Sequence, residues 1–143
     1  DGGAGNGKGH LCTELYGEEI TNQDEGGHLG AEVGANNTAE LSAIAHALRW
    51  ILGESGVESA TIRGDSNYAL NIASGLWTAK ANQALAGRVR DLWDEVSGIV
   101  DLVGEHVPAH RGHRWNERAD HLAFRAMQGE SPLPLQFWKP GQR

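Results

Sequence analysis

The chain has 143 residues, of which 39% are hydrophobic and 22% are charged, and this suits one globular domain with a single core. Its apolar runs are too short to cross a bilayer, and a single cysteine excludes an internal disulfide. The formal net charge of −7 argues against binding nucleic acid by bulk electrostatic attraction. We expect an intracellular protein that has no membrane partner.

The first part of the chain predicts an antiparallel pair of strands. The glycine-rich stretch "DGGAGNGKGH" (1–10) is typical of a loop that follows a strand. Alternation predicts strands in "HLCTELY" (10–16) and "GHLGAEVG" (27–34), and "GEEITNQDEGG" (17–27) between them predicts a loop.

The rest of the chain predicts four helices and two strands. Helices are expected at 36–56, 66–77, 82–100 and 116–129, and strands at 57–65 and 101–107. Asn37 is expected to cap the first helix, and Gly53 or Gly56 to end it. Two close prolines predict an irregular tail at 130–143, after a domain of residues 1–129. This order predicts an α/β fold, a mixed sheet flanked by helices.

Four acids fall where predicted strands end or predicted helices begin. Asp1 precedes a glycine loop, Asp65 leaves a strand, and Glu40 and Asp120 are expected in first helical turns. Carboxylates gathered at one place repel each other unless cations lie between them. Hard oxygen ligands suit magnesium. Two such ions, about 3.5–4 Å apart, can activate water and stabilise the leaving oxygen in phosphodiester cleavage.

Each of these acids also has a purely structural explanation. Glu40 stands three residues after Asn37 and can complete a capping box. Asp65 can cap the next helix, Asp120 can favour a helix dipole, and Asp1 can be a loop acid. Spacing alone leaves both explanations open.

Four segments together resemble the type 1 ribonuclease H family, which includes the ribonuclease H domains of reverse transcriptases. "DGGAGNG" resembles the first catalytic loop, and "NNTAEL" resembles the asparagine-rich turn with its helix start. "GDSNYAL" resembles the strand-to-helix junction, and "VPAHRGHRWNERADHLA" resembles the last block. Four motifs in order across nearly the whole chain are a specific signal. The resemblance implies a ribonuclease H-like mixed five-stranded sheet, its first strand truncated at Asp1.

The resemblance also implies a role for each matching position. Asp1, Glu40, Asp65 and Asp120 would bind two Mg²⁺ ions, for which Mn²⁺ would substitute, and His110 would assist proton transfer or product departure. The reaction would be hydrolysis of the RNA strand of an RNA–DNA hybrid, leaving 5′-phosphate and 3′-hydroxyl ends. Contacts to the hybrid, including its 2′-hydroxyls, are implied for Asn6, Asn36, Asn37, Tyr68, Trp77, Asn82, Arg111 and Asn116.

Three departures from the family pattern affect these expectations. Loss of a central strand leaves buried backbone groups unpaired, at about 1–3 kcal/mol each, so poor folding is expected unless residues precede Asp1. The short "SGLWTAKANQAL" lacks a basic insertion, which resembles the retroelement type and implies help from a neighbouring reverse transcriptase or binding domain. Ala35 stands where relatives often have a threonine that helps hold a DNA phosphate.

Two other functions stay open. One is a catalytically silent ribonuclease-H-like domain that binds nucleic acid or acts as a scaffold in a larger polyprotein, favoured by the acidic surface and the truncated strand. The other is a DNA-processing nuclease of the same fold. Four intact acids favour the enzyme over the scaffold, and the "NN" and "HRGHRWNE" segments favour the ribonuclease over the DNA nuclease. The isolated domain is expected to be a monomer.

Overall fold

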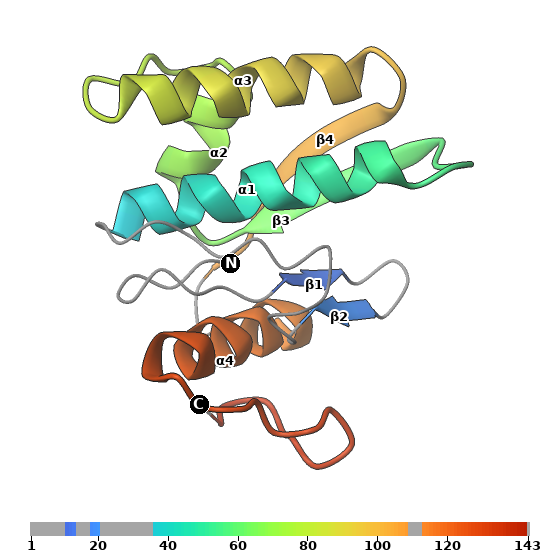
Figure 1. Ribbon diagram of the computed structural model, residues 1–143, viewed down its shortest axis with the longest axis vertical. Helices are drawn as coiled ribbons and strands as arrows, with labels where there is room; N and C mark the ends of the chain where they lie inside the picture. The colour runs from blue at the N-terminus through green and yellow to red at the C-terminus, as the bar shows by residue number, and fades with distance from the viewer. Residues whose placement is uncertain (1–10, 14–17, 21–35, 109–112, 143) are drawn as a thin grey trace.

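Figure 1 shows the computed structural model, which describes residues 11–13, 18–20, 36–108 and 113–142. Strands and helices are interspersed along the chain, which confirms the predicted α/β class. In chain order the elements are β1 (Leu11–Thr13), β2 (Glu18–Ile20), α1 (Asn36–Gly53), β3 (Ser59–Gly64), α2 (Asn67–Ala73), α3 (Gln83–Ser97), β4 (Asp101–His106) and α4 (Arg114–Gln128).

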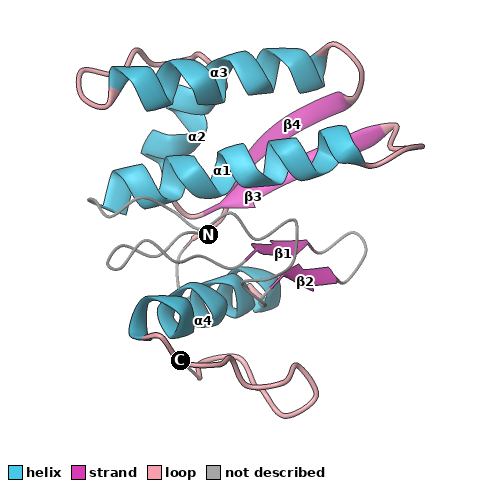
Figure 2. Ribbon diagram, in the orientation of Figure 1, coloured by secondary structure: helices cyan, strands magenta, loops and turns pink. Residues whose placement is uncertain are grey.

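The described strands form two separate pairs, coloured magenta in Figure 2. β1 and β2 are antiparallel, with Leu11 opposite Ile20, and β3 and β4 are parallel, with Ser59 opposite Asp101. Parallel strands need a crossover connection, and here α2 and α3 provide it. Parallel and antiparallel pairing are therefore both present, as expected, but within the described residues the two pairs are not joined into one mixed sheet. A count of five strands stays a prediction, because the described segments hold four.

The core lies between the β3–β4 pair and the helices α1, α2 and α3. Leu41 and Leu48 of α1, like Val89 and Val96 of α3, are fully buried and stand seven residues apart, so each pair lies on one helix face. Burying such a side chain contributes about 1.5–3 kcal/mol. Alternate residues of β3 face this core, as predicted, while the residues between them are exposed.

α4 lies beside β1 on the other side of the molecule, and the tail follows α4 on the face away from β1 (Figure 1). Leu122 and Ala126 of α4 are buried. Residues 130–142 contain turns but no helix or strand, as the two prolines predicted, and the tail returns along α4 to bury Trp138. Within the described segments, every helix is too short or too polar to cross a bilayer.

Several predicted boundaries were wrong. β2 lies within 17–27, which was predicted as a loop; its four-residue connection to β1 is short enough for a local hairpin. The strand predicted at 27–34 lies outside the described residues. α1 already begins at Asn36, so Asn37 is not its cap and Glu40 lies beyond its first turn. α4 begins at Arg114, which places Asp120 in its second turn. The end of α1 at Gly53 was predicted correctly.

Candidate active site

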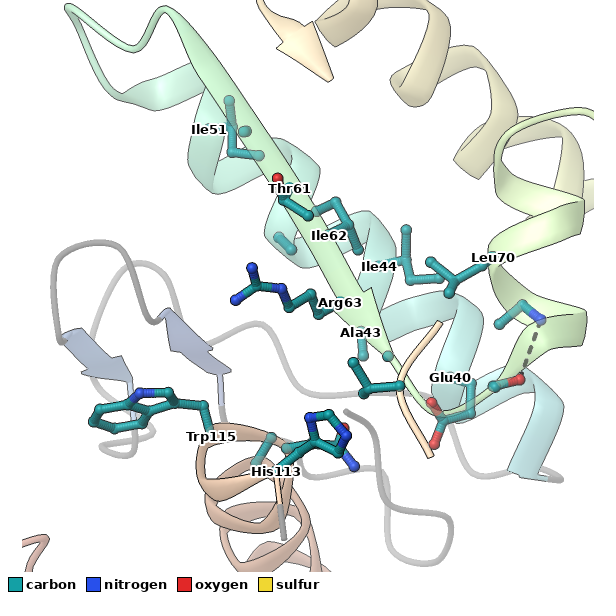
Figure 3. Close-up of a pocket in the computed structure, with 18 of the residues that line it drawn as sticks. Glu40, Ala43, Ile44, Ile51, Thr61, Ile62, Arg63, Leu70, His113 and Trp115 are labelled. Atoms are coloured by element: carbon teal, nitrogen blue, oxygen red, sulfur yellow. Dashed lines mark hydrogen bonds between the residues drawn. The ribbon is translucent and has the colours of Figure 1, made fainter. Parts of the chain in front are cut away.

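A groove of about 630 Å³ follows β3 along its whole length. The residues of α1 form one side of the groove, and the first residues of α4 form another. Figure 3 shows Glu40 and His113 near one end of this groove, and Ile51 with Thr61 near the opposite end. The start of α1, the end of β3 and the start of α4 therefore meet at one end of the groove.

Asp65 follows the last residue of β3 and points toward α4. Asn116 Nδ2 donates a hydrogen bond of 3.3 Å to Asp65 Oδ2, which joins the end of β3 to the first turn of α4. The backbone oxygen of Asp65 lies 3.2 Å from His106 Nε2. Both contacts fix Asp65, whose neighbours Gly64 and Ser66 line the groove.

Asp65 is not the cap of the helix that follows it. Ser66 holds the N-cap position of α2, and its Oγ accepts a hydrogen bond of 3.1 Å from the backbone N–H of Ala69. One of the structural explanations for Asp65 is therefore wrong, because the neighbouring serine satisfies the orphan helix donor.

Glu40 is half-buried and lines the same groove as Gly64, Ser66 and Asn116. The capping box proposed for Glu40 is also wrong, because Asn37 is already inside α1. A carboxylate at this point faces the groove from α1 (Figure 3).

Asp120 is half-buried and stands four residues after Asn116. Residues at this spacing lie on the same face of a helix, so Asp120 lies one turn beyond the residue that contacts Asp65. The prediction that Asp120 stabilises the helix dipole from the first turn is wrong, because the acid in the first turn of α4 is Glu117.

The convergence of all four acids stays a prediction. Asp1 and His110 lie outside the described residues. Within the part of the chain that the structure describes, no group of three or more His, Cys, Asp or Glu side chains is close enough to hold a metal ion. What the structure brings together are three of the four acid-bearing elements, at one end of one groove.

The residues predicted to contact nucleic acid fall into different settings. Asn37, Trp77 and Asn82 are exposed, whereas Tyr68 is half-buried against the core. Asn82 adopts a left-handed conformation with φ 53°, and its Nδ2 donates a hydrogen bond of 3.2 Å to Thr38 Oγ1. This bond ties the start of α3 to the start of α1. Asn6, Arg111 and the side chain of Asn36 are outside the described part.

Two contacts that position Asp65 were not predicted from the sequence. The hydrogen bond from Asn116 to Asp65 joins residues that are 51 positions apart in the sequence, so no local pattern indicates it. The contact of His106 with Asp65 has a weak signal, because parallel pairing of the two predicted strands places His106 opposite Gly64.

Known proteins similar to this chain agree with the fold. The family described as RNase H matches residues 1–128. Ribonuclease H of Roseobacter denitrificans is 33% identical and the match covers 68% of this chain and 69% of that protein. The crystal structure of RNase H1 from the halophilic archaeon Halobacterium salinarum has a TM-score of 0.55 and 30% identity over 71% of each chain. The amino-terminal RNase H domain of a Mycobacterium tuberculosis protein, solved as a fusion with maltose-binding protein, shares the fold with a TM-score of 0.51 and 19% identity over 90% of each chain.

Fold and family together define a nuclease of the hydrolase class. The chain belongs to the RNase H family, as its four motifs predicted. Family and fold therefore support ribonuclease activity on RNA–DNA hybrids.

Proposed function

We propose that this chain hydrolyses the RNA strand of RNA–DNA hybrids with the help of two divalent metal ions, leaving 5′-phosphate and 3′-hydroxyl ends. The observation that carries the proposal is the hydrogen bond of 3.3 Å between Asn116 and Asp65. It holds the acid at the end of β3 against the helix that bears Asp120, beside the groove that Glu40 lines.

The chemistry of these side chains suits magnesium. Carboxylate oxygens are hard ligands, and Glu40, Asp65 and Asp120 are half-buried rather than dispersed in solvent. Asp65 Oδ2 accepts the hydrogen bond from Asn116. With Asp1, these acids would hold two magnesium or manganese ions, which would supply an activated water and charge compensation at the cleaved phosphate.

The other residues of the site would orient Asp65 or transfer a proton. Asn116 holds the Asp65 carboxylate in one orientation, because its amide donates to one of the two carboxylate oxygens. His106 contacts the backbone of Asp65 and fixes the strand end. His110 would move a proton during cleavage or product departure, since an imidazole changes charge near neutral pH.

The hybrid would lie across the starts of α1 and α3. Asn6, Asn36 and Asn37 would contact the minor groove and its 2′-hydroxyls, and Tyr68 and Trp77 would pack against the DNA strand. Asn82 would hold a DNA phosphate near Thr38, to which it is bonded; Arg111 would add a charge. Because the net charge is −7, affinity is expected to depend on a neighbouring domain, such as a reverse transcriptase.

The test is magnesium-dependent cleavage of a labelled hybrid by the parent chain and by Asp65→Asn. We expect Asp65→Asn to bind the hybrid but to lose cleavage, because an amide is a poorer ligand for a hard cation. Asp91→Asn, which changes an exposed acid on α3, is the matched control and should cut like the parent. Equal cutting by Asp65→Asn and the parent would remove Asp65 from the mechanism.

The same assay separates the other candidate functions. Cleavage of duplex DNA without cleavage of hybrid would favour a DNA nuclease. Hybrid binding without any metal-dependent cleavage would favour the silent binding domain.

A further inference from the structure

The tail is fixed against α4 by a cluster of aromatic and cationic side chains. Trp138 is 3% exposed, its Nε1 donates a hydrogen bond of 3.1 Å to the backbone oxygen of Gln142, and its ring lies 6.1 Å from that of His121. The backbone N–H of Leu133 donates a hydrogen bond of 3.0 Å to His121 Nε2. The tail lies beyond the residues that the RNase H family matches, which end at 128.

Two arginines of α4 face the Trp138 ring. The guanidinium carbon of Arg118 lies 5.4 Å from the ring centroid, and that of Arg114 lies 5.8 Å from it. Arg114 also lies over the Trp115 ring, at 5.3 Å. These distances are typical of cation–π contacts, so the Arg114 guanidinium is held by two indole rings, one of which comes from the tail.

The two arginines differ in what they offer to a ligand. Arg118 is 1% exposed and belongs to the interior, whereas Arg114 is exposed. In the described segments, no carboxylate pairs with Arg114, and its side-chain contacts are the two rings. Stacking uses the faces of a guanidinium and leaves its N–H edge available to an oxyanion.

Arg114 is also close to the candidate active site. It lines the same groove as Glu40 and Asn116, and Asn116, two residues further along α4, is bonded to Asp65. Arg114 is therefore an exposed cation, without an ion pair among the described residues, on a chain of net charge −7. Under the proposed function, a nucleic-acid backbone would approach this groove.

We propose that Arg114 binds a phosphate of the nucleic-acid backbone beside the cleavage site, and that Trp138 is a positioning residue that holds Arg114 in place. The inference rests on the proposed function, because the ligand is the same RNA–DNA hybrid. It gives the tail a role in substrate binding in addition to its packing against α4.

The test measures hybrid binding at several salt concentrations in the cleavage-blocked Asp65→Asn background. Log affinity falls as log salt rises, and each phosphate contact makes this slope steeper by about 0.9. Arg114→Ala should therefore weaken binding and make the slope shallower by about 0.9. Arg114→Lys should restore much of the slope, because the charge is kept, but not the full affinity, because the planar stacking is lost. The control is Arg49→Ala, an exposed arginine in the distal half of α1, which should change neither quantity.

A double-mutant cycle tests the role of the tail. Trp138→Ala should lower the affinity and the slope when Arg114 is present, and should change neither in the Arg114→Ala background. Trp138→Phe keeps an aromatic face and should restore binding, which separates positioning from loss of the fold. If Trp138→Ala weakens binding equally in both backgrounds, the tail does not act through Arg114.

The outcomes for this inference and for the proposed function are distinct. If the parent cleaves hybrid but Arg114→Ala binds like Arg49→Ala, the inference is wrong and the proposed function stands. If the parent binds hybrid through Arg114 but does not cleave it in magnesium, the inference stands and the proposed function is wrong. A parent chain that neither binds nor cleaves hybrid, even at the lowest salt concentration, overturns both.

Discussion

The two sides of the molecule are held together by different chemistry. The side built from α1, α2, α3 and the β3–β4 pair has a core that is mainly aliphatic, with Leu48 and Val89 fully buried. The side built from α4 and the tail also buries aliphatic residues such as Leu122, but it adds Arg118, His121 and Trp138. The first side depends on removal of apolar area from water, which needs no special orientation. The second depends in addition on oriented contacts between rings, a guanidinium and backbone groups.

The candidate active site lies where these two sides meet. Asp65 and Glu40 come from the aliphatic side, and Asn116 and Asp120 come from α4. A change in either side therefore affects the acids, but in different ways. Loss of the aliphatic core should unfold the chain, whereas loss of the contact between the sides should misplace the carboxylates in a chain that stays folded.

The largest expected effect comes from breaking the aliphatic core. Leu48→Ala should lower the free energy of unfolding by about 2–5 kcal/mol, because it removes buried contacts and leaves a cavity. Chemical denaturation followed by far-UV circular dichroism measures the change. The control is Leu76→Ala, at a position 73% exposed, which should stay within about 0.5 kcal/mol of the parent. Similar losses in both variants would show that the α1 face is not the main source of stability.

A smaller and more specific effect is expected where the sides meet. Asn116→Ala removes a hydrogen bond to a carboxylate, and such bonds contribute about 1.5–3 kcal/mol. If that energy orients Asp65 during cleavage, kcat should fall by about 10-fold or more, while KM for hybrid stays near the parent value. Single-turnover cleavage and hybrid binding provide the two measurements.

The matched control for this change is Asn71→Ala, a half-buried asparagine of α2 that takes no part in the proposed site. A fall in binding for Asn116→Ala with unchanged cleavage of bound hybrid would contradict the positioning role. Asn116 would then be a substrate contact, as the resemblance first implied.

The aliphatic side was also the more predictable one. Periodic apolar residues and Gly53 predicted α1 almost to its ends, and alternation predicted β3 with its two faces. These elements are encoded locally, because the apolar periodicity and the residues that end each element lie within a few residues of one another. Asp65 was likewise placed correctly at the end of its strand, whereas Glu40 lies beyond the first helical turn in which it was predicted.

The side of α4 and the tail was less predictable for a physical reason. His113 occupies the N-cap position of α4 without a side-chain hydrogen bond, so no capping signal marks the start of that helix. Arg114 is instead held by Trp115 and by Trp138, which stands 24 residues further along the chain. Contacts over such a separation leave no local pattern, and the bond from Asn116 to Asp65 escaped prediction for the same reason.

The smallest expected effect is on the free energy of unfolding when an ion pair of the tail is removed. It tests whether aromatic or ionic contacts attach the tail to α4. Arg125 Nη1 lies 3.2 Å from Glu130 Oε2 and joins α4 to the tail, while Arg63 Nε lies 3.6 Å from Glu105 Oε1 across the β3–β4 pair. Both acids are about half exposed, and such pairs contribute about 0–1 kcal/mol because water and salt screen them. Glu130→Gln and Glu105→Gln should therefore lower the free energy of unfolding by similar, small amounts. If Glu130→Gln cost much more than Glu105→Gln, and the excess vanished at high salt, the tail would be attached by charge, and Trp138 would lose its place as the residue that holds it.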